Sequence, residues 1–591
     1  MTEPTSAAVQ LLGGWDYAVI VFFAVLMASL SIICRKLNKN PSDYFRGGGN
    51  MLWWVGGISA MATAISAWSF TGAAAKCYQD GFLYPATLVI GTVPAILAMW
   101  FIAPRFRRLR VITAMEGVFR RFGMGTEQFY TWFTLPMGLF WGGIGLNTIG
   151  VFMAGVFRMD VATTVLVFGA LLTFVAVLGG QWALSFFAVV QGILLVLVVI
   201  TVAVLSLMRP EIGGWANLPA VLPARHLNFA FESSGALVTI WFIYQILFWA
   251  LGQMDLRNSG KFVRVKDDSA ARRMVLVMFV PALLMLPVLM QLPAICAAVV
   301  FPDLAMVFPM LKSPAEGAWL AMALTVLPQG LIGLMVAVMF GATADSTDAA
   351  LNSNAGFFTR NVYARYIRPQ ASAKNQVFTG KIITGIFGVI TIGVALAVNS
   401  LRNLNLFDLF QVLNAMLLPP MIVPMVLGVF IKRTPDWSGW STVVAGLVAA
   451  VIVNALYSAE AVQALLGLDR ALSLREVVES QFIVISTATW GVSILWFLST
   501  RLFWGKSRPE HRERIEALFA DLARPVNHMG EGGEDQDSMQ YRVVGGLFLL
   551  TGGALMLGAL IPNPLYGRII FMVIGGMLLL MGLVFWRLAK R

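Results

Sequence analysis

The sequence predicts an all-α protein that crosses a membrane many times. Of its 591 residues, 58% are hydrophobic and only 12% are charged, whereas a soluble domain carries about 25% charged residues. Mean hydropathy is +0.78. Apolar stretches close to the ~20 residues that a spanning helix needs recur along the whole chain. These observations predict a polytopic helical protein of the cell (inner or plasma) membrane, with the lipid bilayer as its surroundings.

We predict about fifteen transmembrane helices. They lie near residues 15–34, 53–76, 83–102, 128–156, 161–179, 184–208, 235–256, 273–301, 319–350, 379–399, 406–432, 437–458, 480–500, 543–562 and 568–588. The regions 53–208 and 235–432 each contain five of them. Because an odd number of helices inverts the topology, this count predicts a 5+5 inverted repeat. The first helix of such a repeat is interrupted at mid-membrane, and the small residues from Ala62 to Ser69 are the candidate break.

The distribution of basic residues predicts the orientation. Lysine and arginine gather after the first, third, seventh and ninth spans, and the intervening loops contain few. The positive-inside rule then places the N-terminus outside and the C-terminus in the cytoplasm, as fifteen crossings also require. The net charge of +12 therefore belongs to membrane-facing loops. We expect no nucleic-acid partner.

Three regions follow one another along the chain. Residues 1–500 hold thirteen spans, 501–542 form a cytoplasmic linker, and 543–591 form a two-helix hairpin. Within the linker, Pro509–Leu522 predicts an amphipathic helix whose apolar face contains Ile515, Leu518, Phe519 and Leu522. This segment is either a binding site for a cytoplasmic partner or a simple interfacial linker. The three scattered cysteines predict neither a disulfide framework nor a metal site.

Two acids interrupt an otherwise apolar helix. Asp345 and Asp348 are three residues apart, so they share a helix face, with Ser346 on its flank. One acid at the centre of a bilayer costs roughly 2.5–3.5 kcal/mol on the insertion scale. A bound small, hard cation offsets this cost and suits these oxygen ligands. The alternative is that the acids are protonated or hydrogen-bonded to a neighbouring helix.

Four ordered motifs in residues 15–500 resemble those of the sodium:solute symporter family. The run Gly48–Ala62 resembles the entry to the family's first core helix, and Gly179-Gly180 with Val189-Val190-Gln191 resembles the fifth. Asp345–Tyr363 resembles the eighth core helix and its following loop. Pro419-Pro420 with Phe430–Arg433 resembles the end of the tenth. The resemblance implies a LeuT-like fold with two additional C-terminal helices.

The resemblance also implies a site for the coupling ion, Na⁺. Its carbonyl ligands correspond to Ala62, Ile65 and Ala342, and its side-chain ligands to Asp345 and Ser346. Asp348 corresponds to a serine of a second sodium site in some members. Those members place an aspartate of that site where this chain has Ala188, so Asp348 either supplies the acid from another wall or pairs across the bundle.

The solute site implied by the resemblance lies between the first, sixth and tenth core helices. Its contacts correspond to Ser69, Gln245 and Gln411. The two glutamines donate and accept hydrogen bonds, which suits a hydroxyl-rich or amide ligand. Phe248 and Trp249 are candidates for an aromatic gate. We assign Trp68 as a stacking face, and ordinary helix packing is the alternative for all three aromatic residues.

These features predict secondary active symport of a small polar organic solute into the cell, by alternating access. A sugar or sugar derivative is favoured, followed by a small carboxylate or an amino acid.

Proton coupling is the nearest alternative, since repulsion between Asp345 and Asp348 favours a shared proton. An intramembrane protease needs aspartates on two helices, whereas both lie on one. A transporter-like sensor would signal through 501–542. Symport requires neither an enzyme activity nor an organic cofactor.

Overall fold

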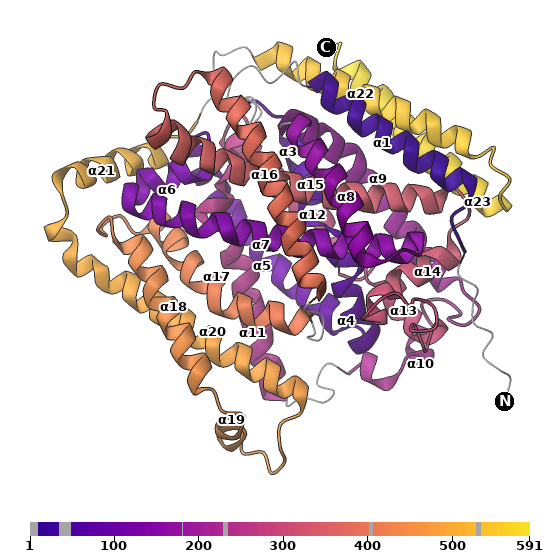
Figure 1. Cartoon of the computed structure of the whole chain (residues 1–591), viewed down its shortest axis with the longest axis horizontal. Coiled ribbons are helices and arrows are strands. Elements are labelled where there is room, and N and C mark those ends of the chain that lie inside the picture. The colour runs from indigo at the N-terminus through magenta and orange to yellow at the C-terminus, as the bar shows by residue number, and fades with distance from the viewer. Residues whose placement is uncertain are drawn as a thin grey trace.

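The computed structural model describes residues 10–34, 49–179, 181–228, 235–285, 287–400, 406–526 and 533–590. Side chains at 344–346, 348–349 and some helix-end positions are also outside its description. The described residues form a bundle of helices that cross one another in several layers (Figure 1). The prediction of an all-α membrane fold is confirmed.

Ten of the described helices are long and apolar enough to cross a membrane. They include α5 (Leu83–Arg108), α7 (Met124–Phe157), α11 (Gly235–Gln253), α16 (Ala373–Ser400), α18 (Ser438–Leu456), α20 (a helix over Leu474–Ser499), α22 (Gly533–Gly558) and α23 (Leu565–Leu588). The rest of the ten come from α9 (Gln181–Leu207) and α17 (Leu406–Phe430). Shorter apolar segments occur in α1 (Gly14–Cys34), α8 (Val161–Gly179) and α15 (Leu331–Phe358).

The first core helix is broken where the sequence predicts it. Helix α3 (Trp53–Ala64) ends at Ile65, which is extended with φ −99° and ψ 129°, and Ser66 is also extended. A 3₁₀ turn and then α4 (Gly72–Asp80) continue the chain in the same region. Because extended backbone makes no i→i−4 bonds, the end of α3 leaves carbonyl groups without helical partners.

Two of the predicted spans are wrong, because each divides into two helices. The stretch 319–350 is not one span, because α14 (Ala318–Val326) and α15 are separate helices. Pro328 lies between them, and Gly330 adopts a φ of +80°, which favours glycine. The stretch 273–301 likewise divides into α12 (Asp268–Met285) and α13 (Leu292–Val300). In contrast, α11, the first helix of the predicted second repeat, is continuous over its described length.

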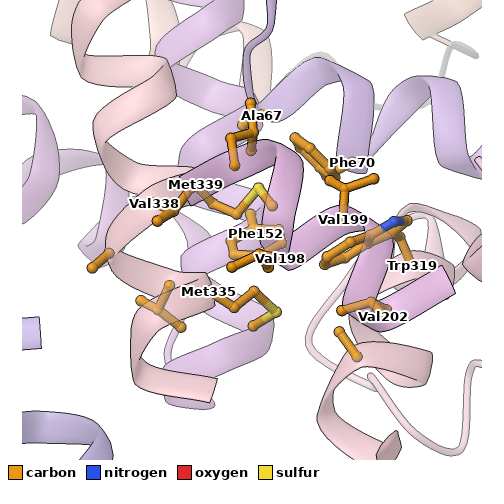
Figure 2. Packing of buried hydrophobic residues seen from close by; sticks show 14 of the residues in the cluster. Ala67, Phe70, Phe152, Val198, Val199, Val202, Trp319, Met335, Val338 and Met339 are labelled. Carbon is orange, nitrogen blue, oxygen red and sulfur yellow. The ribbon is translucent and has the colours of Figure 1, made fainter. Parts of the chain in front are cut away.

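The largest buried cluster fixes the positions of α9 and α15 (Figure 2). Among its side chains are valines and methionines of these two helices and aromatic residues from three neighbouring segments: Val198, Val199, Val202, Met335, Val338, Met339, Phe70, Phe152 and Trp319. The rings of Phe70 and Trp319 meet edge to face with centroids 4.9 Å apart. Close packing of this kind holds membrane helices together in the absence of water.

The N-terminal helix α1 caps α15. The buried carboxylate of Asp16 accepts hydrogen bonds from the backbone N–H groups of Gly330, at 2.6 Å, and Gly333, at 2.8 Å. A side chain on Gly333 would clash with the Asp16 backbone, since its Cβ would lie 2.3 Å from the Asp16 carbonyl oxygen. A negative charge at a helix N-terminus also complements the helix dipole. The start of α15 is therefore fixed by α1.

The C-terminal hairpin of α22 and α23 braces two core helices. At one end, Gln540 accepts a hydrogen bond from the N–H of Leu52 at 2.9 Å and donates one to the carbonyl of Asn50 at 2.9 Å, directly before α3. At the other end, the Asn563 amide donates to the carbonyl of Gln329 at 2.8 Å, just before α15. The hairpin, coloured yellow, lies at the same edge of the molecule as α1 (Figure 1).

The amphipathic helix predicted in the linker is confirmed as α21 (Pro509–Ala523). Its residues Ile515, Leu518 and Leu522 are buried, and Phe519 is half-buried. The helix packs on α6 (Ala114–Phe122) and α5. This apolar face is covered by the protein itself.

Candidate functional site

A cavity of about 220 Å³ lies between five segments of the bundle. Helix α11 supplies the largest share of its lining, and the broken first helix, α5, α17 and α20 supply the remainder. Its residues are Trp68, Tyr84, Thr87, Trp241, Gln245, Phe248, Trp249, Gln253, Gln411, Asn414, Leu418 and Phe482. Five of the six residues predicted to contact the solute therefore share one cavity.

Ser69 is the exception among the predicted solute contacts. It does not line the cavity, and its carbonyl oxygen accepts a hydrogen bond from Gln291 at 3.1 Å. The 3₁₀ geometry of Ala67–Phe70 separates the direction of Ser69 from that of Trp68.

Sequence reasoning missed seven of the lining residues. Three of them follow from helical periodicity, because Trp241 is four residues before Gln245, and Asn414 and Leu418 are three and seven residues after Gln411. Tyr84 and Thr87 share a face of α5 in the same way. Phe482 on α20 carries no sequence signal, since α20 is outside the two predicted repeats.

The cavity combines aromatic walls with neutral hydrogen-bonding groups. The ring of Phe248 lies 5.8 Å from that of Phe482 and meets the Trp490 ring edge to face at 5.9 Å. Four amide side chains, those of Gln245, Gln253, Gln411 and Asn414, can both donate and accept. No charged side chain is among the described residues that line this cavity. The site therefore suits an uncharged polar ligand with an apolar ring face.

Two glycines allow the tryptophans to lie close to helix backbones. A Cβ on Gly72 would be 2.6 Å from the Trp68 ring, and one on Gly91 would be 2.8 Å from the Trp249 ring. Both distances are shorter than any normal contact. Trp68 and Trp249 are thus positioned by the absence of a side chain opposite each ring.

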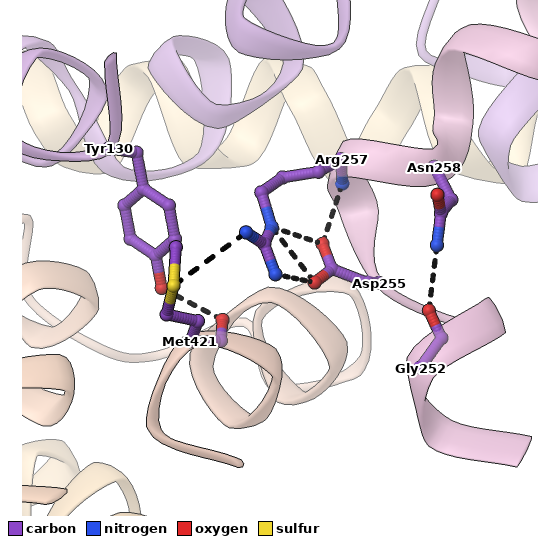
Figure 3. Close-up of polar contacts among 6 residues, drawn as sticks. All are labelled: Tyr130, Gly252, Asp255, Arg257, Asn258 and Met421. Carbon is purple, nitrogen blue, oxygen red and sulfur yellow. Dashed lines mark hydrogen bonds and ion pairs between the residues drawn. The ribbon is translucent and has the colours of Figure 1, made fainter. Parts of the chain in front are cut away.

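A polar cluster lies around the end of α11, which supplies most of the cavity lining (Figure 3). Asp255, at the end of α11, is buried and pairs with Arg257 at 2.5 Å. The Asn258 amide donates to the carbonyl of Gly252 at 2.7 Å. The Tyr130 hydroxyl donates to the carbonyl of Met421 at 2.9 Å and so joins α7 to α17. These contacts tie the ends of the cavity helices together.

The predicted cation site lies where α3 breaks beside α15. Ala62, Ile65 and Ala342 are buried, with exposures of 0%, 1% and 0%. The N–H of Ala67, just after the break, donates to the hydroxyl of Thr343 at 2.9 Å. This bond connects the two helices whose carbonyl groups are the predicted ligands. Sequence reasoning did not single out Thr343, although it stands next to Ala342.

The acidic part of this site belongs to α15. Asp345, Ser346 and Asp348 fall within the helix, but their side chains lie outside the described part of the structure. Their contribution to a cation site therefore stays a prediction. Among the side chains that are described, no cluster of three or more histidine, cysteine, aspartate or glutamate residues forms a metal site.

Comparison with known proteins identifies the family. The model of the sodium:solute symporter family matches residues 44–464. The chain belongs to this family. It is therefore a sodium-coupled solute transporter of the membrane and not an enzyme.

Two relatives and one solved structure place the chain within the family. A sodium/sialic acid symporter of Proteus mirabilis is 23% identical over 74% of this chain and 88% of its own. The sodium/myo-inositol cotransporter 2 of Mus musculus is 24% identical over 74% of this chain and 69% of its own. The structure of a Na⁺-coupled sialic acid symporter in its substrate-bound outward-open state gives a TM-score of 0.66. It is 18% identical and covers 84% of this chain and 99% of that one, which confirms the LeuT-like fold.

Proposed function

We propose that this symporter carries a neutral, hydroxyl-rich ring solute into the cell together with Na⁺. The observation that supports this solute class is the cavity itself, in which four amides and six aromatic rings accompany no charged side chain among the described lining residues. Amides bond hydroxyl groups, and aromatic faces pack on the apolar face of a ring. At about 220 Å³ the cavity is smaller than the ~300–1,000 Å³ usual for drug-sized ligands, so the solute is small.

The two kinds of relative sharpen this proposal. Sialic acid carries a carboxylate, whereas myo-inositol is an uncharged ring with hydroxyl groups. A site for a carboxylate is expected to present an arginine or lysine, and none is among the described residues around the cavity. We therefore favour a cyclitol or neutral sugar over an acidic sugar, a small carboxylate or an amino acid.

We propose that Na⁺ binds between the break in α3 and α15. The carbonyl groups of Ala62, Ile65 and Ala342 would hold it with the side chains of Asp345 and Ser346, and Asp348 would assist. The end of α3 at Ala64, the extended backbone of Ile65 and Ser66, and the Ala67–Thr343 bond support this assignment. Occupancy of the site would favour the arrangement in which the solute cavity opens to the outside, and the coupling would be reciprocal.

The proposed topology places the N-terminus outside and α21 in the cytoplasm. Arginines gather around α21 and the ends of α5 and α6, which is the pattern expected of a cytoplasmic face. In this scheme the repeats at about 53–208 and 235–432 form the transport core, and the hairpin at 533–590 is an accessory. Since the apolar face of α21 is already covered, we favour an internal linker over a partner-binding site for 501–542.

Uptake into proteoliposomes tests the proposal. Wild type and Asp345→Asn would be supplied with myo-inositol, a neutral hexose, sialic acid, a small carboxylate and an amino acid. Sodium and proton gradients would be imposed separately. We expect sodium-driven uptake of a neutral ring solute that Asp345→Asn abolishes. Uptake that follows the proton gradient alone would assign the aspartates to proton transport, and uptake restricted to acids would overturn the solute class.

A further inference from the structure

Gln191 on α9 has a side-chain oxygen without a hydrogen-bond partner. The residue is 3% exposed, and its Oε1 atom is fully buried. Its Nε2 group donates to the carbonyl of Val338 on α15 at 3.0 Å. This bond fixes the orientation of the amide, because the reverse orientation would oppose two oxygens. A buried acceptor left in this state loses its hydration without compensation.

The unpaired oxygen lies against Gly341 of α15, the residue before the predicted cation ligand Ala342. A Cβ built on Gly341 would lie 2.5 Å from Gln191 Oε1, so only a glycine leaves room for the amide group. Gly341 directly precedes Ala342, whose carbonyl is a proposed ligand. The amide therefore occupies space that any other residue at 341 would fill.

The same turn of α9 also touches α3. A Cβ on Gly192 would lie 3.3 Å from the Cβ of Ala62 and 3.2 Å from a methyl group of Ile58. Ala62 supplies another of the proposed carbonyl ligands, one turn before the break. Gln191 and Gly192 thus stand where α3, α9 and α15 meet, and the oxygen at this junction is the one that lacks a partner.

We propose that Gln191 Oε1 is a further ligand of the coupling cation, which makes the site a junction of three helices. This inference rests on the proposed sodium site. Sodium is a hard cation that binds amide and carbonyl oxygens, and a neutral ligand adds no charge beside the acids proposed for the site. Binding supplies the partner that the oxygen lacks. Because Nε2 stays bonded to Val338, Na⁺ would also link α9 firmly to α3 and α15.

The test measures Na⁺ affinity in purified full-length protein. Gln191→Leu removes the oxygen at similar volume, while Gln191→Glu keeps an oxygen but cannot donate to Val338 when ionised. Each variant is titrated with NaCl against choline chloride, and the readouts are the rise in Tm without solute and the half-saturating Na⁺ concentration for uptake. We expect Gln191→Leu to raise that concentration about fivefold or more, the factor typical of a lost buried polar contact. Gln191→Glu should be impaired less than Gln191→Leu if the oxygen is what matters, because a carboxylate still supplies an oxygen ligand.

Asn563→Leu is the matched control. Asn563 is also a buried amide whose side-chain N–H donates to a backbone carbonyl, that of Gln329 at 2.8 Å, but it lies in the loop between α22 and α23, away from the break in α3. Its half-saturating Na⁺ concentration should match wild type. Should Gln191→Leu fail to fold, Gln191→Met takes its place.

Three outcomes would overturn the inference. Unchanged Na⁺ affinity in Gln191→Leu would exclude a ligand role. Equal impairment in the Leu and Glu variants would show that the bond to Val338 matters and the oxygen does not. A wild type whose Tm and uptake ignore Na⁺ would remove the proposed sodium site as well, so this failure is distinguishable from the other two.

Discussion

The solute cavity and the seam under α21 contain different kinds of polar group: the seam holds paired charges, and the cavity holds neutral side chains. We define the seam as the contacts of α21 with the ends of α5, α6, α12 and α17. In the seam, Asp521 accepts from Arg120 at 2.5 Å and from Arg110 at 3.1 Å, and Arg108 pairs with Asp268 at 2.7 Å. In the cavity, the described lining contains amides, the hydroxyl groups of Tyr84 and Thr87, and aromatic rings, without any charged side chain.

This difference indicates which polar groups are paired within the protein and which are available to bind a ligand. The seam charges are paired within the chain, so that region gains a fixed arrangement. Neutral amides tolerate burial at lower cost than charges and can exchange partners when a solute enters and leaves. We therefore expect changes in the cavity to alter solute affinity, and changes in the seam to alter stability.

The largest effect is expected from Gln245→Leu in the cavity. The leucine removes both hydrogen-bonding atoms at nearly unchanged volume and leaves the solute hydroxyl unpaired. A lost hydrogen bond of this kind costs about 1–3 kcal/mol, so KM for the solute should rise roughly 5–150-fold. Initial uptake rates against solute concentration, at saturating Na⁺, measure the change.

The seam provides the control for this variant. Glu516→Gln removes the partner of Lys432 on an exposed part of α21 and should leave KM unchanged. If Gln245→Leu and Glu516→Gln shift KM equally, the cavity is not the solute site.

The next effect is expected from Asp521→Asn in the seam. This change removes the negative charge shared by Arg110 and Arg120 and leaves the two arginines to repel each other. Because all three side chains are partly exposed, we expect a loss of only about 1 kcal/mol. Thermal unfolding should show a fall in Tm of roughly 1–3 °C. A tenfold change in solute KM without a fall in Tm would contradict the division between the two regions.

The sequence predicted the cavity better than it predicted the details of the backbone. Gln245 was predicted from the family resemblance, and Phe248 and Trp249 as the aromatic residues that follow it; the structure places all three on the regular helix α11, where they line one cavity. Ser69 directly follows Trp68, and consecutive residues of a helical turn point in different directions, so Ser69 does not line the cavity with Trp68.

The backbone conformation at the break after α3 could not be predicted from the local sequence. No glycine or proline marks Ile65 and Ser66, so local propensity does not specify their extended backbone. The bond from Ala67 to Thr343 helps to hold it, across 276 residues of chain. The unpaired oxygen of Gln191 could not be predicted from local sequence either, because its lack of a partner depends on how α9 packs against α15. Long-range contacts of this kind cannot be read from periodicity.

The seam also predicts a modest dependence of stability on pH. His511 is buried, its Nδ1 accepts from Arg514 at 2.8 Å, and its Nε2 donates to the carbonyl of Thr434 at 3.0 Å. Burial lowers the pKa of His511 below its usual 6.5, the Thr434 carbonyl raises it, and Arg514 and Arg121 lower it further. The unfolded chain then binds the proton more tightly, so stability is complete above about pH 6.5 and falls as the pH drops below it.

His511→Gln is the informative variant, because glutamine retains a donor and an acceptor but does not titrate. We expect the fall in Tm between pH 7.5 and 5.5 to be smaller in this variant than in wild type, by about 1–2 °C. His226, whose pKa is also lowered by burial and by Arg225, lies in the 3₁₀ turn Ala224–His226, outside the seam. His226→Gln should remove a separate part of the slope. Parallel curves for wild type and His511→Gln would show that the seam does not sense protons.

The smallest effect, and the finest test of the cavity, is expected from Gly91→Ala. The new methyl group would lie 2.8 Å from the Trp249 ring, which must move. Trp249 is 37% exposed and borders the cavity, so the ring can shift towards the solute without disturbing the core. Overpacking of this kind costs about 1–3 kcal/mol when nothing yields. We therefore expect only about a two- to fivefold rise in KM, larger for bulkier solutes than for small ones.

Gly145→Ala on α7, where a Cβ meets nothing within 4 Å, should leave uptake unchanged. If Gly91→Ala raised KM equally for every solute, Trp249 would contribute to helix packing and not to solute selectivity.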